Sequence, residues 1–322
     1  MRSEHISVTI DLERVRANAE RVRQRCGVAL IAVVKADAYG LGAVQVVAAL
    51  DSVADGFACF SLEEARALKR PCLVLGPALG DPAEYRALGA TPTIATPAEA
   101  ERFAGGSVAI NVDTGMQRFG CAPAALDAIC EIAHPTDIFT HAVDESSASL
   151  LYEVGQGRKA RLHAAATSLL DCAGARLDAV RPGLALYRGA VRVTARLHMP
   201  RDCTGPIGYT HFRRRRVGIL LAGYSHGITR GPLRINGRVQ EIVEVGMNTS
   251  FVTVDEADRE GDEIVLLSDE LNEAELARHA GTREHAILCR LASCGLRTYR
   301  GERVSPPPRD TTRSSASSPP RT

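Results

Sequence analysis

Short apolar runs alternate with helix-forming stretches over roughly the first 200 residues of this 322-residue chain. The runs Cys72–Gly76 and Val108–Asp113 are short and mainly apolar, as strands are, whereas Leu62–Arg70 and Pro97–Gly105 are rich in Ala, Glu and Arg and predict helices. Strand followed by helix, repeated, is typical of parallel α/β folds. The pattern therefore predicts a closed α/β barrel or an open doubly wound sheet.

The pattern changes after about Gly205, where short β-rich runs separated by turn residues continue to Val304. The pair Asn236-Gly237 lies between two such runs and predicts a tight hairpin, because both residues tolerate the positive φ of a type I′ turn. One helix is predicted over Glu270–Ala280. Residues 305–322 are rich in Pro, Ser and Thr and have too little apolar surface for a core, so they predict a disordered tail.

The composition is that of an ordinary soluble protein, with 45% hydrophobic residues and a net charge of +1. No nucleic-acid or membrane partner is indicated: the longest basic run, Arg213–Arg216, is short and favours a solvated strand edge. The first residues lack the apolar core of a secretion signal, and no stretch approaches the roughly 20 apolar residues that span a bilayer. We expect a cytoplasmic protein. The nine cysteines show no zinc-site spacing, so we expect reduced thiols and no metal.

Lys35 closes the apolar run Ile31–Lys35 and enters a turn that contains Gly and Tyr. The run has the character of a parallel strand covered on both faces, so Lys35 is expected at a strand end, where α/β folds build active sites. Burial disfavours the ammonium and makes the amine nucleophilic enough to form a Schiff base. Tyr39 offers a hydroxyl for a phosphate. The competing interpretation is a lysine that extends its charge to solvent.

Seven segments of the chain resemble segments of alanine racemases, and they occur in the same order. They are AVVKADAYGLG (32–42), NVDTGMQRFG (111–120), FTHAVDE (139–145), VRPGLALY (180–187), LAGYSHG (221–227), VGMNTSFVTVD (245–255) and ELARHAGTREHAILCRL (275–291). One such match would be weak evidence, but seven in order are specific and extend over nearly the whole chain. The chain is identified as a member of this family of fold type III pyridoxal phosphate enzymes.

The resemblance implies a (β/α)8 barrel over residues 1–200 that binds pyridoxal 5′-phosphate, followed by a smaller, mainly-β domain over 205–304. The first residues, Ile6–Ile10, are expected to return to the second domain. A barrel of this kind normally needs about 250 residues, and at most about 200 are present here. We therefore expect some barrel helices to be trimmed or missing.

The resemblance further implies that Lys35 carries the cofactor and that two bases flank the substrate Cα. Lys35 serves one face and Tyr224 the other. A phenol must be partly ionised to act as a base, and His141 and Arg118 match the residues that assist it in the family. On spacing alone, Tyr224 within GYSHG is more typical of a turn tyrosine.

Arg181 matches the arginine that faces the pyridine nitrogen. A guanidinium stays cationic and only donates, so the nitrogen remains unprotonated and side reactions are limited. Without the resemblance, this segment is interpreted as a strand closed by a Pro-Gly turn with a surface arginine. The phosphate is expected against Tyr39, Thr167 and backbone amides near Gly183 and Leu184, because N–H and hydroxyl donors best hold a dianion in a barrel mouth.

The family also implies a homodimer with shared sites, in which Arg118 and Met247 contact the substrate. Lys35 lies in the barrel and Tyr224 in a separate domain about 190 residues later. The connection around Met199-Pro200 does not obviously let that domain fold back over its own barrel, whereas a two-fold partner presents the same loop at both barrels. Tyr224 and Met247 of one chain are expected to complete the site around Lys35 of the other.

Several positions depart from the family pattern. Asn111 replaces a lysine that can be carbamylated, Ala166 an asparagine, His226 and Asn248 aspartates, and His285 a tyrosine that usually reaches the phosphate. Three functions follow from these matches and departures: a racemase of alanine that supplies D-alanine for peptidoglycan, a racemase of another amino acid such as serine, or a weakly active homologue that binds the cofactor.

Overall fold

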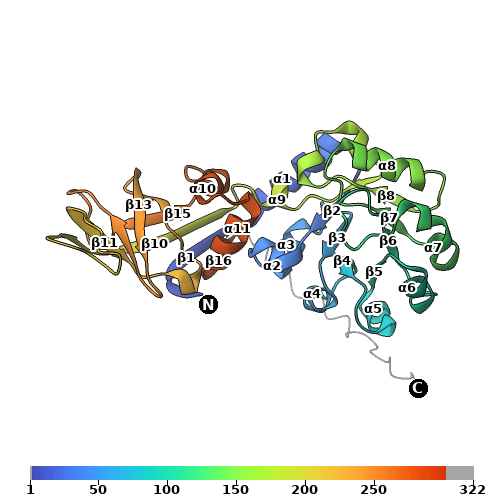
Figure 1. Cartoon of the computed structure of the whole chain (residues 1–322), viewed down its shortest axis with the longest axis horizontal. Coiled ribbons are helices and arrows are strands. Elements are labelled where there is room, and N and C mark those ends of the chain that lie inside the picture. The colour runs from blue at the N-terminus through green and yellow to red at the C-terminus, as the bar shows by residue number, and fades with distance from the viewer. Residues whose placement is uncertain (1, 302–322) are drawn as a thin grey trace, which may run out of the picture.

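The computed structural model describes residues 2–301, which form two bodies arranged end to end in an elongated molecule (Figure 1). One body is a closed barrel and the other is an eight-stranded sheet. The tail predicted for residues 305–322 lies outside the described residues. Among the described residues, no helix has both the length and the apolar character needed to cross a bilayer.

Eight short parallel strands close the barrel in chain order, which confirms the barrel and excludes the open doubly wound sheet. They are β2 (Ala29–Val33), β3 (Gly56–Cys59), β4 (Cys72–Pro77), β5 (Ala90–Ile94), β6 (Ala109–Asn111), β7 (Asp137–Phe139), β8 (Arg161–His163) and β9 (Ala179–Val180). Buried apolar side chains from these strands, among them Ile31, Val33, Leu73 and Phe139, form a cluster of their own.

Most of the helices around the barrel are short, and α1 is the longest with 15 residues. They are α1 (Leu12–Cys26), α3 (Ala43–Leu50), α4 (Leu62–Leu68), α5 (Pro82–Leu88), α6 (Pro97–Arg102), α7 (Leu126–Ala133), α8 (Glu145–Gly155) and α9 (Leu184–Tyr187). Between β8 and β9, where every residue is described, the chain has only the 3-10 turns η2 (Thr167–Leu169) and η3 (Ala173–Ala175) instead of an α-helix. The connection from β8 to β9 therefore lacks the α-helix that each of the other connections between successive barrel strands contains.

Helix N-caps gather on one face of the barrel because most of the helices follow a strand. The side chains of Ser61, Asp81, Thr96 and Asp144 accept hydrogen bonds from first-turn amides of α4, α5, α6 and α8. This face, at the carboxyl ends of the strands, is the mouth of the barrel, where catalytic side chains of such barrels lie.

Lys35 begins a left-handed turn rather than ending a strand, since β2 stops at Val33 and α2 (Lys35–Tyr39) follows. Four successive non-glycine residues, Ala36 to Tyr39, have φ between 52° and 58°. Each costs about 1–2 kcal/mol relative to a right-handed conformation. Contacts from distant elements hold the turn: Glu64 accepts from the Ala36 amide at 2.8 Å, and Arg297 pairs with Asp37 at 2.6 Å.

Glycine should relieve this strain. We expect Ala36→Gly to raise the free energy of unfolding by about 1 kcal/mol, because glycine adopts positive φ without the Cβ clash. The matched control is Ala48→Gly in α3, because Ala48 is also exposed but has a right-handed backbone. This variant should lower the free energy of unfolding by about 1 kcal/mol. Chemical denaturation of both variants measures the two changes, and a change of the same sign in both would contradict the argument.

The second body is an antiparallel sheet with one parallel edge pair. Its strands are ordered β11 (Arg216–Leu220), β14 (Ser250–Thr253), β13 (Arg238–Val245), β12 (Gly231–Ile235), β15 (Glu263–Leu267), β10 (Val191–Asp202), β1 (Ser3–Asp11) and β16 (Gly295–Arg300). β1 pairs with β10 through Ile6 opposite Ala195 and Ile10 opposite Val191, which confirms the return of the first residues to this body. Residues 3–11 and 191–202 thus belong to the sheet.

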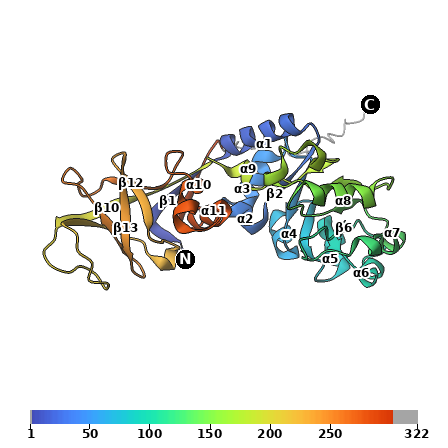
Figure 2. The same cartoon turned by 45° about the horizontal axis from the view of Figure 1, so that its top comes forward.

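Local signals in the second body also correspond to structure. Asn236 and Gly237 join β12 to β13 with φ of 51° and 77°, as the hairpin prediction requires. The predicted helix starts at Glu273, because the Asn272 side chain caps its first turn, and α10 (Glu273–Ala280) is followed by α11 (Glu284–Ala292). Both helices lie between the sheet and the barrel (Figure 2).

Candidate active site

A cavity of about 950 Å³ lies at the mouth of the barrel and extends to helices α10 and α11. All of the predicted site residues that come from the barrel line it: Lys35, Tyr39, Arg118, His141, Thr167, Arg181, Gly183 and Leu184. The structure therefore brings together residues spread over about 150 positions of sequence. Tyr224 and Met247 are not among its lining residues.

Lys35 is half-buried and lines this cavity. Burial lowers the pKa of its ammonium, and the positive charge of Arg118 lowers it further, against an opposing effect of Glu64. A larger fraction of the amine is then uncharged at neutral pH than in an exposed lysine. The structure thus favours the nucleophilic lysine over the solvated one.

Hydroxyl and amide groups converge at one end of the cavity. The Thr167 hydroxyl accepts from the amides of Gly183 at 3.4 Å and Ala185 at 3.1 Å, which places this side chain beside the predicted backbone segment at Gly183 and Leu184. A Cβ on Gly183 would overlap the Tyr39 hydroxyl, which explains the glycine. Burial raises the pKa of Tyr39 to about 12, so its hydroxyl is a donor at neutral pH. These groups suit a phosphate.

Arg181 is buried, at 4% exposure, so its interpretation as a surface arginine is wrong. Its guanidinium donates to the carbonyl oxygen of His163 at 2.7 Å, to that of Thr140, and to the ring Nδ1 of His163. It also lies 4.9 Å from the centre of the Phe139 ring. Burial lowers the pKa of Arg181 to about 9, which leaves it cationic at neutral pH.

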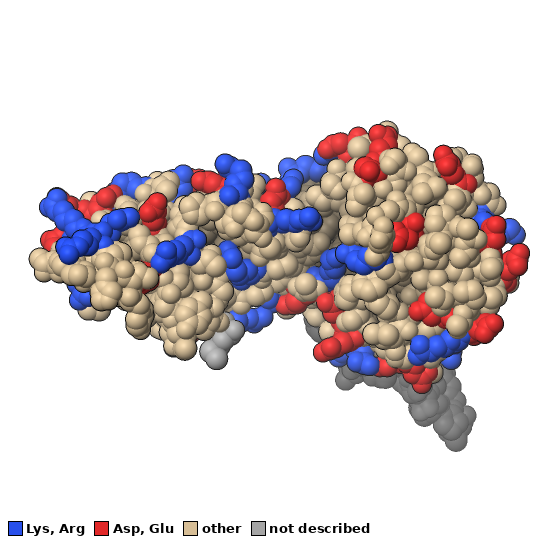
Figure 3. All heavy atoms as spheres, viewed as in Figure 1, with Lys and Arg blue, Asp and Glu red and all other residues tan. Residues whose placement is uncertain are grey.

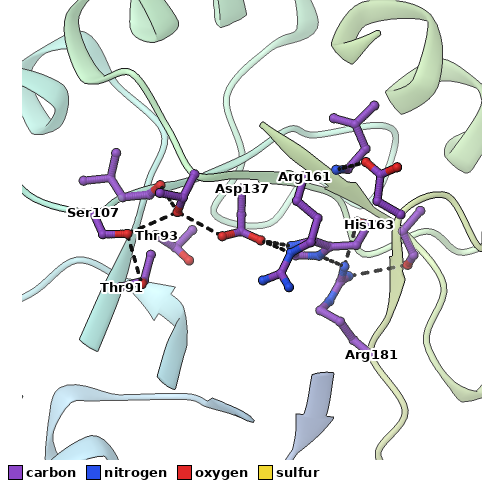
Figure 4. Close-up of polar contacts among 12 residues, drawn as sticks. Thr91, Thr93, Ser107, Asp137, Arg161, His163 and Arg181 are labelled. Atoms are coloured by element: carbon purple, nitrogen blue, oxygen red, sulfur yellow. Dashed lines mark hydrogen bonds and ion pairs between the residues drawn. The ribbon is translucent and has the colours of Figure 1, made fainter. Parts of the chain in front are cut away.

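A buried polar network behind Arg181 was not predicted (Figure 4). His163 Nε2 lies 3.1 Å from Asp137 Oδ1, and Arg161 donates to the same oxygen at 2.7 Å. A carboxylate can only accept, so Nε2 carries the proton and the Nδ1 lone pair faces Arg181. His163 follows Arg161 at the end of a short strand, and nothing in that pattern separates it from an ordinary core histidine.

The network predicts that the free energy of unfolding falls at acidic pH. Burial lowers the pKa of His163 to about 3, and hydrogen bonds and charge from His163 and Arg161 lower the pKa of Asp137 to about 2 although burial opposes this. The unfolded chain then binds protons that the folded chain does not. Stability from His163 is complete above its ordinary pKa of 6.5 and is lost as the pH falls toward 3.

We expect this histidine alone to lower the free energy of unfolding by about 1.4 kcal/mol per pH unit between about pH 6 and 4. Chemical denaturation over that pH range measures the slope. His163→Gln should reduce the slope by one proton, whereas His134→Gln, at an exposed position, should not change it. An unaltered slope in His163→Gln would show that the buried imidazole is not its source.

His141 and Arg118 also line the cavity. Burial, followed by the positive charges of Arg181, Arg118 and Lys35, lowers the pKa of His141 to about 4, so its ring is neutral at physiological pH. Asn111 donates to the carbonyl oxygens of Arg118 at 3.3 Å and Phe119 at 3.0 Å. The asparagine therefore supports the backbone of the Arg118 turn.

Tyr224 and Met247 lie close together in two connections between strands of the sheet, with 58% and 59% of their surfaces exposed. The Tyr224 amide donates to Gly246 O at 2.9 Å in the turn η4 (Tyr224–His226). Two departures from the family pattern stabilise this turn: His226 Nδ1 accepts from the Gly223 amide at 3.2 Å, and Asn248 accepts from Ser225 at 2.9 Å.

Further lining residues were not singled out from the sequence. They include the exposed Phe60 and Phe119 of the barrel and, from the segment that leads into α11 and from that helix, Arg283 and Cys289. Ala166 also lines the cavity, so the departures at Ala166 and His285 both fall inside the site. The sequence could not show which residues of the second body line the cavity, because this depends on how α11 packs against the barrel.

Comparison with known proteins adds independent findings. Two family models match: "Alanine racemase, N-terminal domain" over residues 10–191 and "Alanine racemase, C-terminal domain" over residues 205–299. The alanine racemase of Methylobacterium nodulans is 31% identical over 353 aligned positions, covering 89% of this chain and 94% of the relative. That of Neisseria meningitidis is 28% identical and covers 89% and 97%.

Solved structures are similar in fold. The biosynthetic alanine racemase of Pseudomonas aeruginosa superposes with a TM-score of 0.84 at 24% identity, over 92% of this chain and all of that one. The alanine racemase of Bartonella henselae, solved with covalently bound pyridoxal phosphate, gives the same TM-score, identity and coverage. Both have the two-body architecture seen here.

Proposed function

Because the chain belongs to the alanine racemase family, we propose that it interconverts L-alanine and D-alanine with pyridoxal 5′-phosphate held in the cavity around Lys35. One observation carries the proposal. A single cavity is lined by a lysine with a lowered pKa, by a cluster of hydroxyl and amide groups, and by a buried arginine. This donor set fits the cofactor, whose aldehyde, phosphate and ring nitrogen need an amine, N–H and O–H donors, and a polar partner respectively.

The chain's own residues then have distinct tasks. The cofactor, when bound, supplies the electron sink that makes the substrate Cα proton acidic. The Lys35 amine removes or returns this proton on one face, and the Tyr224 hydroxyl of a second chain does so on the other. Neutral His141 and cationic Arg118 stabilise negative charge near that phenol.

Arg181 is expected to limit side reactions in the site. It can only donate hydrogen bonds, and His163 and the backbone carbonyls hold it in place. Arg181 would therefore hold the ring nitrogen of the bound cofactor without protonating it, and the cofactor would stabilise negative charge at the substrate Cα less strongly. Transamination and similar side reactions should be slow for this reason.

The biological setting is part of the same proposal. The active unit is a homodimer in the cytoplasm, with each site completed by Tyr224 and Met247 of the other chain, and its product D-alanine enters peptidoglycan. The exposure of Tyr224 and Met247 away from their own cavity supports a shared site. A second amino acid such as serine remains an alternative substrate, favoured by the polar replacement His285 in the cavity wall.

The test is a racemisation assay with a panel of L-amino acids, followed by chiral separation of the products. The proposal expects D-alanine to form fastest. Faster formation of D-serine would favour the second substrate. Cofactor binding without racemisation of any amino acid would identify a weakly active homologue instead.

The phosphate site makes its own prediction. Tyr39→Phe should weaken cofactor binding by about tenfold or more, because a hydrogen bond to a charged group contributes about 1.5–3 kcal/mol. Titration of the cofactor-free protein measures the dissociation constant. Tyr85→Phe, which removes a buried hydroxyl bonded to Leu79 O at 2.9 Å far from the cavity, is the control and should bind normally. Equal affinity in both variants would refute the role of Tyr39.

A further inference from the structure

A second cavity, of about 620 Å³, shares a wall with the candidate active site. It is lined by helix α1, the connection from β8 to β9, the end of α9 and the start of α10. Four residues line both cavities and are called the partition here: Thr167, Arg188, Ala274 and Glu284. The first two come from the barrel and the other two from the second body. The molecule narrows where the two bodies meet, and basic side chains lie on both sides of this junction (Figure 3).

An ion pair between the two bodies forms half of the partition. Arg188 follows α9 and donates to Glu284 Oε2 at 2.6 Å, and Glu284 is the first residue of α11. The Arg188 side chain is 53% exposed and that of Glu284 is 29% exposed. Exposed pairs of long side chains are weak, so thermal motion separates them readily. The other two members, Thr167 and Ala274, are small, so little side-chain volume separates the cavities once the pair has parted.

A second carboxylate lies near Arg188. Glu273 is buried and lines the second cavity but not the first. Burial raises the pKa of Glu273 and the charge of Glu284 adds to this, whereas backbone hydrogen bonds and the charge of Arg188 oppose it. Arg188 thus interacts with a carboxylate of the partition and with one inside the second cavity. When it leaves Glu284 it still has an anionic partner, which makes opening of the pair easier.

The position of Thr167 indicates which ligand uses this connection. The second cavity is lined by equal numbers of acidic and basic side chains, four of each, so net charge selects no ligand. Thr167, however, belongs to the cluster of hydroxyl and amide groups that suits a phosphate, and it is also part of the partition. Lys35 lines only the first cavity. A phosphate monoester that enters aldehyde first from the second cavity therefore reaches Lys35 with its aldehyde and Thr167 with its phosphate.

We propose that the second cavity is an entry site for a phosphate monoester, through which pyridoxal 5′-phosphate enters and leaves, and that the Arg188–Glu284 pair is its gate. The inference rests on the proposed function, since it takes the cofactor to lie around Lys35, and adds the route by which the cofactor arrives. In the proposed dimer, Tyr224 and Met247 of the second chain lie at the barrel mouth. A separate route lets the cofactor exchange while the dimer stays intact.

A gate and a binding contact have different kinetic effects. Weakening a gate speeds uptake and release together and leaves their ratio, the dissociation constant, nearly unchanged. Weakening a contact with the bound cofactor speeds release alone and raises the dissociation constant. Uptake and release of the cofactor, measured separately, therefore distinguish the two roles of the Arg188–Glu284 pair.

The first test removes the charge of the gate. Uptake is followed by stopped-flow absorbance after pyridoxal 5′-phosphate is added to the cofactor-free protein, and release by exchange of the holoenzyme against isotope-labelled cofactor. Glu284→Gln keeps the positive charge of Arg188 and should speed both processes about two- to fivefold. Glu256→Gln, which removes the exposed partner of Arg215 at 2.7 Å on the sheet, is the control and should change neither rate. Faster release with unchanged uptake would make the pair a binding contact and overturn the gate.

The second test narrows the connection. Ala274→Phe should slow uptake and exchange at least about tenfold, and Glu284→Gln/Ala274→Phe should be as slow as Ala274→Phe alone, because both changes act on one passage. Ala286→Phe adds the same side chain at an exposed position of α11 that lines neither cavity, and it should exchange normally. Chemical denaturation checks that both variants are folded.

Normal uptake and exchange in folded Ala274→Phe would show that the cofactor passes through the barrel mouth, and would overturn the inference. The racemisation assay on the wild-type protein judges the proposed function separately. A protein that exchanges its cofactor in the expected pattern but racemises no amino acid would support the entry site and contradict the racemase.

Discussion

Lys35→Ala is expected to reduce racemisation by at least about 10⁴-fold, since it removes both the attachment point of the cofactor and the base on one face of the substrate. The wild-type protein should be yellow after loading with pyridoxal phosphate. Borohydride reduction should then fix the added mass on one peptide. The chain has only three lysines, Lys35, Lys69 and Lys159, so the peptide map is unambiguous.

Lys69→Ala is the matched control, because Lys69 is exposed and lies outside the cavity. It should keep its colour and activity. Label on Lys69 or Lys159, or a colourless wild-type protein after loading, would refute the assignment of Lys35.

Two inactive variants should restore activity to each other if the site is shared between chains. Tyr224→Phe keeps Lys35 but lacks one base, and Lys35→Ala keeps Tyr224. After reversible dissociation and mixing in equal amounts, half of the dimers are mixed and each has one intact site, so about a quarter of wild-type activity should return. The exposure of Tyr224 outside its own cavity is the structural reason for this expectation.

The control for this experiment replaces Tyr224→Phe with the double variant Lys35→Ala/Tyr224→Phe. Mixed with Lys35→Ala, it provides no intact lysine and should restore nothing. Mass measurement must show that mixed dimers form. Inactive mixed dimers in the first mixture would mean that Tyr224 acts in its own chain or not at all.

Much of the fold was predictable because it depends on local patterns in the sequence. Alternating apolar and helical stretches predicted a parallel α/β body, the resemblance implied that it closes into a barrel, and Asn236-Gly237 predicted the hairpin from backbone preferences alone. The resemblance located Lys35, Tyr39, Thr167 and Arg181 before the structure showed that they share a cavity. Such residues are recognisable because their neighbours along the chain form motifs.

Other features depended on contacts between distant segments. The left-handed turn after Lys35 is unfavourable for its own residues and exists because Glu64 and Arg297, from a barrel helix and from the other body, hold it. Nothing in the residues from Ala36 to Tyr39 indicates a left-handed backbone, since alanine, aspartate and tyrosine all prefer other conformations.

The sequence by itself determined most of the strands and helices and indicated the side chains that we propose for the chemistry, because strand and helix periodicity and motif residues are local properties. Only the tertiary structure decided that Arg181 is buried against His163, that Asp137 sets the tautomer of that histidine, and that Tyr224 lies outside its own cavity. These depend on closing the barrel and on the way the sheet extends from it. Burial, hydrogen-bond partners and pKa values arise when segments far apart in sequence pack together, so no stretch of residues encodes them alone.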